Sequence, residues 1–124
     1  MKFYGNVIFF GCESLGTIRS FYGDFLQLEL DRDQGKCLIY NLPGGDRLGF
    51  CEHHPTNTEG KSPIITFLCK NKTEVDEVYE LFKEKGLKLS GPPVEKSEFA
   101  IYNFFSEDPE GHTLEVQTFL DGRK

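Results

Sequence analysis

Glu115 is the residue of this sequence whose type and setting best suit chemistry. It lies within residues 113–117 (TLEVQ), where polar and apolar residues alternate as on a β-strand with one buried face. A carboxylate on such a strand is costly to bury unless it is paired. Three roles remain open: a structural ion pair, for which Arg47 is one partner, recognition of a cationic ligand, or general acid–base catalysis.

The cysteines give weaker signals. No two of them form a C-x-x-C pair, which argues against a zinc centre or a thioredoxin-like site. In a reducing cytosol we expect buried thiols rather than disulfides. Cys51 would act as a nucleophile only beside a base, and the sequence places no histidine on its face of a strand. The four are Cys12, Cys37, Cys51 and Cys69.

The three histidines have ordinary structural explanations. His53 and His54 are neighbours, and neighbours on a strand point to opposite faces, so together they could bind one ion only from a loop. We expect both to be solvated loop residues, and we expect His112 to serve a turn.

Composition argues against several classes of protein. The 124 residues fit one domain, and 38% of them are hydrophobic, which is enough for a core. A net charge of −6 and the lack of any Lys/Arg run argue against nucleic-acid binding. No apolar stretch approaches the ~18 residues of a membrane span, and the N-terminus does not read as a signal peptide. We therefore expect a soluble, cytoplasmic protein without a nucleic-acid or membrane partner.

An internal repeat predicts the architecture. Residues 7–12 (VIFFGC) match residues 64–69 (IITFLC), and a helical pattern follows each, at 14–26 and at 73–86. Three short strand-like runs follow each helix and end in a hairpin with a Pro-Gly or Pro-x-Gly turn. The prediction is an α+β fold of two tandem βαβββ modules: module 1 at about 1–52, a linker at 53–62 and module 2 at about 63–120. The expected later strands are 27–31, 36–42, 47–52, 87–90, 99–106 and 112–119.

Two motifs on this repeat resemble the vicinal oxygen chelate superfamily, which includes glyoxalases, bleomycin-resistance proteins and extradiol dioxygenases. Residues 21–26 (FYGDFL) resemble the end of the family's first helix, with Gln27 where a glycine is usual. Residues 108–116 (DPEGHTLEV) resemble its closing hairpin. The resemblance covers essentially the whole chain, and it implies two half-open sheets that together enclose a cavity.

The resemblance also implies where a metal would bind. Metal-dependent members take one ligand, usually His or Glu, from the first and the last strand of each module. The equivalent positions here are Asn6 or Val7, Gly49, Pro63 and Glu115, so only Glu115 offers a strong ligand. We therefore expect no metal and no cofactor.

Strand alternation, counted from these positions, predicts the lining of the cavity. It predicts that Val7, Phe9, Ile64 and Leu68 face the helices. The opposite set is apolar and aromatic with a few polar groups, as in small-molecule sites, although the rings could also simply fill the space. The predicted ligand-binding residues are Asn6, Ile8, Phe10, Arg47, Cys51, Ile65, Phe67, Thr113, Glu115 and Gln117.

The resemblance implies a small-molecule-binding protein similar to bleomycin-resistance and glyoxalase-like members, with the metal site lost. Its ligand would be a small organic compound, aromatic or cationic, and the protein would be a homodimer. The alternative is a metal-dependent glyoxalase-, isomerase- or dioxygenase-type enzyme that uses Glu115. A third possibility is a protein–protein module whose cavity is filled.

Overall fold

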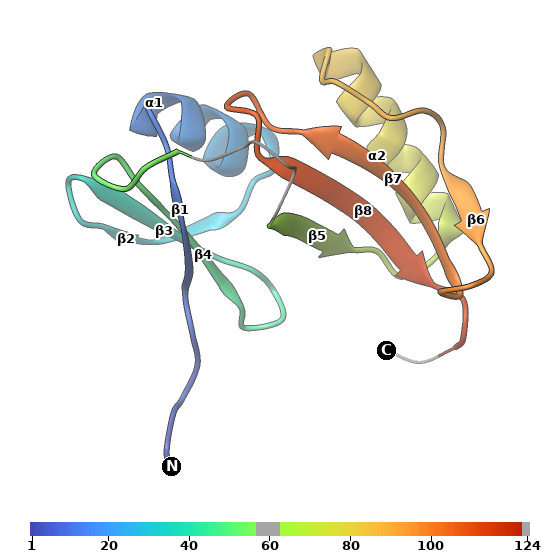
Figure 1. Ribbon diagram of the computed structural model, residues 1–124, viewed down its shortest axis with the longest axis horizontal. Helices are drawn as coiled ribbons and strands as arrows, with labels where there is room; N and C mark the ends of the chain where they lie inside the picture. Colours follow the sequence, from blue (N-terminus) through green and yellow to red (C-terminus); the bar gives the residue numbers. More distant parts are fainter. Residues whose placement is uncertain (57–62, 123–124) are drawn as a thin grey trace. The chain divides into compact units, whose positions relative to one another are not determined.

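The computed structural model describes residues 1–56 and 63–122, and the chain forms two compact units, Met1–Asn57 and Thr58–Lys124 (Figure 1). Residues 57–62 of the expected linker lie outside the described residues. No helix in the described ranges is long and apolar enough to cross a membrane.

The two units have the same topology. In each, the first and last strands pair in parallel at one side of a four-stranded sheet, and the remaining pairs are antiparallel. The first sheet has the order β1-β4-β3-β2 and the second β5-β8-β7-β6, which confirms the α+β fold of two βαβββ modules. The first unit contains β1 (Ile8–Gly11), α1 (Leu15–Ile18), the π-helix η1 (Arg19–Phe25), β2 (Glu29–Asp33), β3 (Cys37–Asn41) and β4 (Arg47–Cys51). The second contains β5 (Ile64–Leu68), α2 (Lys72–Lys85), β6 (Val94–Lys96), β7 (Ile101–Glu107) and β8 (Thr113–Phe119).

Backbone hydrogen bonds in the two closing turns repeat the correspondence between the units. The Leu42 N–H donates to the Asp46 carbonyl, and the equivalent Asp108 N–H donates to the His112 carbonyl. Gly45 and Gly111 hold equivalent places in these turns, with φ of 93° and 92°. Because that conformation favours glycine, the two turns account for the two matching glycines of the sequence repeat.

The helix after β5 begins earlier than expected. Its N-cap is Asn71, whose side chain accepts from the Glu74 N–H, whereas the helical pattern of the sequence begins at residue 73. The Glu74 carboxylate accepts in return from the Lys70 N–H. Gly86 ends the helix in the left-handed conformation, at the last residue of the predicted helical range.

The helix after β1 differs more from the expectation of a single α-helix. Ser14 caps it by accepting from the Thr17 N–H, but after one α-helical turn the backbone widens into η1, in which the Leu26 N–H reaches the Phe21 carbonyl. Gly23 lies against β3 here, since a Cβ on it would be 3.2 Å from the Tyr40 hydroxyl.

Residues 87–90 are not a regular strand, contrary to expectation. They contribute one isolated bridge, from Leu89 to Ser106, and the edge strand is β6 instead. Gly91, with φ of 136°, and the two prolines that follow it interrupt pairing, because proline has no N–H for a ladder.

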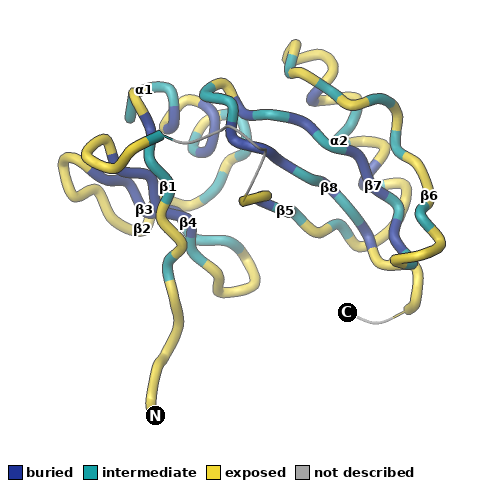
Figure 2. Tube along the Cα trace, viewed as in Figure 1, coloured by how far each residue is buried: buried dark blue, intermediate teal, exposed yellow. Residues whose placement is uncertain are grey.

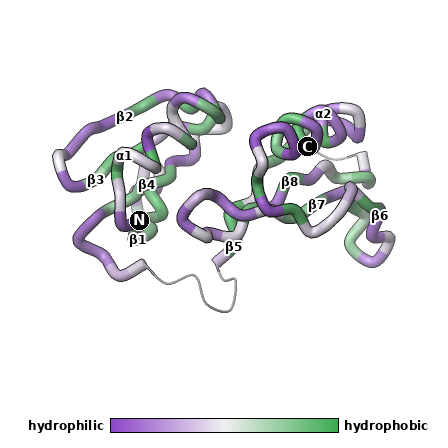
Figure 3. Tube along the Cα trace, turned by 90° about the horizontal axis from the view of Figure 1, so that it is seen from above, coloured by the Kyte–Doolittle hydropathy of each residue, from purple (hydrophilic) through white to green (hydrophobic). Residues whose placement is uncertain are grey.

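The core of each unit lies between its helix and one face of its sheet (Figure 2). Phe50 of β4 packs on Tyr22 of η1 with ring centroids 4.4 Å apart, and Phe104 of β7 packs edge-on to Phe82 of α2 at 5.7 Å. We call the opposite side of each sheet its helix-free face. The outer strand β2 is exposed and hydrophilic (Figure 3), and such charged edges discourage pairing with other chains.

Candidate functional site

Glu115 is the centre of a polar cluster on the helix-free face of the second sheet. Thr66, its direct neighbour on β5, donates from Oγ1 to Oε1 at 2.8 Å. Asn103, on β7, donates from Nδ2 to Oε2 at 2.6 Å. Both carboxylate oxygens of this half-buried residue therefore have a donor, and neither donor carries a charge.

Two further oxygen atoms of this face have no partner within the described residues. They are Oδ1 of Asn103 and Oε1 of Gln117, which belong to a directly paired couple of β7 and β8. Asn103 is only 1% exposed, and an unsatisfied buried acceptor costs about 1–3 kcal/mol. The cluster of Glu115, Asn103 and Gln117 is thus rich in acceptors, and it suits a group that brings N–H or O–H donors.

A cavity of about 340 Å³ lies in the same unit, beside this cluster. Phe105, the strand partner of Glu115, forms part of its wall, and so does Thr113. An ion pair of Lys88 and Glu107, 3.4 Å apart, contributes two charged groups to the lining. The volume is in the range of small-ligand pockets. The lining residues are Ile64, Lys88, Leu89, Ser90, Phe105, Ser106, Glu107 and Thr113.

The structure places the predicted lining residues of the second unit on two different sides of the sheet. Thr113, Glu115 and Gln117 do share a face. Ile65 and Phe67 lie on the other side, because they pair with Leu114 and Val116, which share the helix-covered side with Phe104. The residues of β5 on the face of Glu115 are Ile64, Thr66 and Leu68.

The same one-residue error affects the first unit. Ile8 and Phe10 pair with Leu48 and Phe50, on the helix-covered side, rather than with Gly49. The strand partner of Gly49 is Phe9. Asn6 precedes β1 and is exposed.

The four positions that the resemblance assigns to metal ligands do not fit a metal. A Cβ on Gly49 would lie 2.4 Å from the Phe9 ring and 3.1 Å from Val7, so a ligand side chain has no room there. Pro63 has no donor atom in its side chain. Glu115 alone offers a charged ligand, and both its oxygens are already engaged by Thr66 and Asn103.

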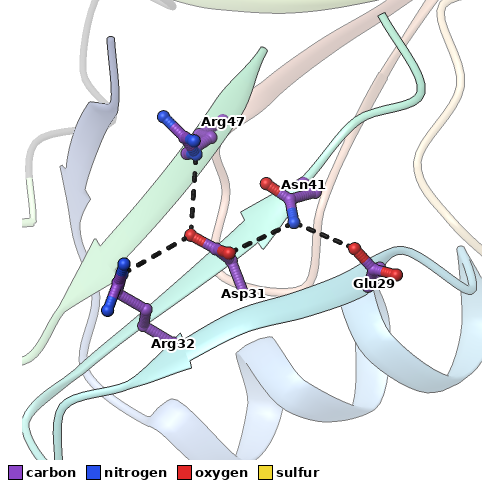
Figure 4. Close-up of polar contacts among 5 residues, drawn as sticks. All are labelled: Glu29, Asp31, Arg32, Asn41 and Arg47. Atoms are coloured by element: carbon purple, nitrogen blue, oxygen red, sulfur yellow. Dashed lines mark hydrogen bonds and ion pairs between the residues drawn. The ribbon is translucent and has the colours of Figure 1, made fainter. Parts of the chain in front are cut away.

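Arg47 has an acidic partner in its own unit. Its Nε lies 3.5 Å from Asp31 Oδ2, an ion pair without a hydrogen bond, and its guanidinium lies 5.9 Å from the centroid of the Tyr4 ring. Asp31 also accepts from Asn41, 3.3 Å away. Figure 4 shows Asp31 in contact with Arg47, Arg32 and Asn41, and the charge of Arg47 faces Asp31.

Cys51 has a role that the sequence did not suggest. It is bonded to Cys37, directly opposite on β3, so the expectation of thiols is wrong for these two residues. The exposed His53 places Nδ1 3.8 Å from the Cys37 sulfur. The other cysteines, Cys12 and Cys69, remain thiols, and burial raises the pKa of Cys69.

The remaining histidines behave as expected. His54 is exposed in the loop after β4. His112 is buried in the closing turn, where Nδ1 lies 2.7 Å from Asp108 Oδ2 and the backbone N–H donates to the same carboxylate. Its role there is structural.

Comparison with known proteins identifies a family. The model of the Glyoxalase/Bleomycin resistance protein/Dioxygenase superfamily matches residues 6–116. A glyoxalase/bleomycin resistance protein/dioxygenase from Nocardioides is 16% identical, with a TM-score of 0.79, over 100% of this chain and 88% of that one. Lactoylglutathione lyase from Agrobacterium tumefaciens is 20% identical, with a TM-score of 0.74, over 94% of this chain and 95% of that one. No curated protein matches the chain in sequence.

Proposed function

We propose that this chain, which belongs to the glyoxalase/bleomycin resistance protein/dioxygenase superfamily, is a small-molecule-binding protein that recognises a donor-rich, cationic or aromatic ligand through Glu115. We propose further that it has lost the metal site of its metal-dependent relatives. One observation carries the proposal: the acceptor-rich cluster of Glu115, Asn103 and Gln117 on a sheet face beside a cavity of about 340 Å³.

The chemistry of the cluster supports a cation. Glu115 accepts from two neutral donors, and no cationic side chain of the described residues forms an ion pair with it. A ligand ammonium or amidinium group would add the missing charge, and its N–H groups would satisfy the acceptors of Asn103 and Gln117. Phe105 and Ile64 supply apolar surface for the rest of such a molecule.

A metal-dependent enzyme is the second candidate, because Glu115 stands where the family's carboxylate ligand would stand. Lactoylglutathione lyase is among the similar structures and bears the name of an enzyme. Against this candidate is the ring of Phe9, which fills the space that a side chain at Gly49 would need.

Calorimetric titration with benzamidine, an aromatic cation with N–H donors, tests the proposal. Benzyl alcohol serves as the uncharged aromatic control. We expect benzamidine to bind more tightly than benzyl alcohol to the wild type, and Glu115→Gln to abolish the difference while leaving the fold intact. Equal affinity for both probes would contradict the proposal. Stoichiometric Ni²⁺ or Zn²⁺ binding that Glu115→Gln removes would favour the enzyme instead.

We propose a homodimer as the working form. The helix-free faces carry exposed apolar side chains, which need cover to remain soluble. A stable pair would bury about 1,000 Å² or more. Light scattering at micromolar concentration should give twice the mass of the chain, and a monomer mass would contradict this. The residues concerned are Phe9, Ile64, Leu68 and Phe119.

A further inference from the structure

We propose that Cys37, Cys51 and His53 form a redox-gated site for a thiophilic divalent cation such as Zn²⁺. The disulfide is the closed state of this site. Reduction opens it by supplying two thiols beside an imidazole, and these bind the ion as thiolates. All three residues belong to the first unit, whereas the Glu115 cluster belongs to the second.

The geometry brings three suitable donors together. One ligand atom from each of the three residues lies within 4.8 Å of the others. Tetrahedral zinc, with Zn–S of about 2.3 Å and Zn–N of about 2.0–2.1 Å, requires a sulfur and a nitrogen ligand to be about 3.6 Å apart. The observed distance from Cys37 Sγ to His53 Nδ1 is 3.8 Å. This pair is therefore already near the spacing that the ion needs.

The two sulfurs must separate, and their backbone positions permit it. Cys37 and Cys51 face each other on paired strands, and their side chains project to the same side of the sheet. After reduction, rotation of each side chain can take the sulfurs to the about 3.8 Å that tetrahedral zinc requires. His53 follows Cys51 by two residues in an exposed turn, so its ring can adjust.

Opening and loading the site need only a dithiol reductant and Zn²⁺. A dithiol reductant passes two electrons to the Cys37–Cys51 bond and becomes a disulfide, and the two cysteines take up two protons. Zn²⁺ then displaces both protons as the thiols bind as thiolates, and neutral His53 binds through a ring nitrogen. The two thiolates balance the charge of the ion. Three protein ligands leave a fourth position for water or an external ligand.

The surroundings of Cys37 and Cys51 favour binding of an ion by their reduced form. Both cysteines are buried, and His53 is exposed at the edge, which gives an ion a route from solvent. In a reducing cytosol disulfides are rare, so the open state would be the resident one there. In an oxidising setting the disulfide would exclude the ion.

Competition with a chromogenic zinc chelator tests the inference on the intact protein, reduced with a phosphine under anaerobic conditions and compared with the oxidised form. We expect the reduced protein to bind one Zn²⁺ and the oxidised form to bind about 100-fold more weakly or not at all. Cys37→Ser and Cys51→Ser should each weaken binding about 100-fold, and His53→Asn about 10-fold. Cys69→Ser is the matched control and should bind like the wild type.

Alkylation read by mass spectrometry gives a test without mutation. Zn²⁺ should protect Cys37 and Cys51 of the reduced protein but leave the modification of Cys69 unchanged. Circular dichroism confirms that each reduced sample is folded. Failure of the reduced, folded protein to compete for Zn²⁺ would overturn the inference, and so would affinity unchanged by both serine variants. Binding removed by Glu115→Gln instead would assign the ion to the second unit and also overturn it.

Discussion

Replacing Glu115 by glutamine separates a ligand-binding carboxylate from a structural one. The amide keeps the size of the side chain and one acceptor oxygen for Asn103. Its NH₂ can donate to the hydroxyl of Thr66, which can act as donor or acceptor. The variant thus preserves both contacts of Glu115 and removes only the charge.

The size of the effect follows from these contacts. Hydrogen bonds to a charged group contribute about 1.5–3 kcal/mol and neutral ones about 0.5–1.5 kcal/mol, so each bond should weaken by about 1 kcal/mol. Solvent screening of this partly exposed carboxylate reduces the sum for two bonds to about 1 kcal/mol. Glu115→Ala should cost about 2–3 kcal/mol, because it leaves the buried amide of Asn103 without an acceptor.

Urea denaturation followed by fluorescence or circular dichroism measures both variants, with the exposed Glu98→Gln as the matched control. Benzamidine titration of the same samples should show at least a tenfold loss of affinity in Glu115→Gln, equivalent to about 1.4 kcal/mol. A stability loss above about 3 kcal/mol in Glu115→Gln would show instead that the carboxylate neutralises a buried cation of the protein. An unchanged Glu115→Ala would show that the two hydrogen bonds contribute nothing in solution.

Three further predictions test local features. Gln27 has φ of 59° where relatives usually carry glycine, so Gln27→Gly should raise the free energy of unfolding by about 0.5–1 kcal/mol in urea denaturation. The hydrogen bond to Asp76 raises the pKa of Tyr102 to about 12, above the ordinary value of about 10. The stabilisation of the fold by this hydrogen bond should therefore be complete below pH 10 and be lost as the pH rises through 12. In a pH titration followed by phenolate absorbance, Asp76→Asn should lower the ionisation midpoint of Tyr102 towards pH 10. Gly49→Ala should cost about 1–3 kcal/mol by thermal denaturation, because its Cβ meets Phe9, and Phe9→Ala should restore most of that loss.

The topology could be predicted because duplication leaves similar residue patterns in the two halves, and these can be recognised without knowing how the side chains pack. The VIFFGC and IITFLC runs both became first strands, and both glycine turns adopted the same hydrogen bonds. Ser14 and Gly86 end helices through local chemistry, which a short window of sequence contains. The π-helical widening of η1 was not predicted, because the apolar spacing of residues 14–26 is that of an ordinary α-helix.

Which side of the sheet each side chain faces was harder to predict than where the strands lie. β5 reads IITFL and β1 reads IFFG, and runs this apolar carry no alternation from which to judge which side is buried. Their orientation is fixed only by pairing with β8 and β4, which do alternate around Glu115 and Gly49. Counting from the ends of the strands rather than from these partners gave the wrong side for Ile8, Phe10, Ile65 and Phe67.

The disulfide was, by contrast, within reach of the sequence. In an antiparallel hairpin each step back on one strand matches a step forward on the other, so pairing Asn41 with Arg47 also pairs Cys37 with Cys51. In the internal repeat Gly49 corresponds to Glu115, and by the same shift Cys37 corresponds to Asn103 and Cys51 to Gln117. Asn103 and Gln117 are likewise paired in the second sheet. The same place on the helix-free face thus holds two sulfurs in one module and two amides with unsatisfied oxygens in the other. Duplication kept the backbone site while its side chains diverged, to a pair of cysteines in the first unit and to a pair of amides in the second.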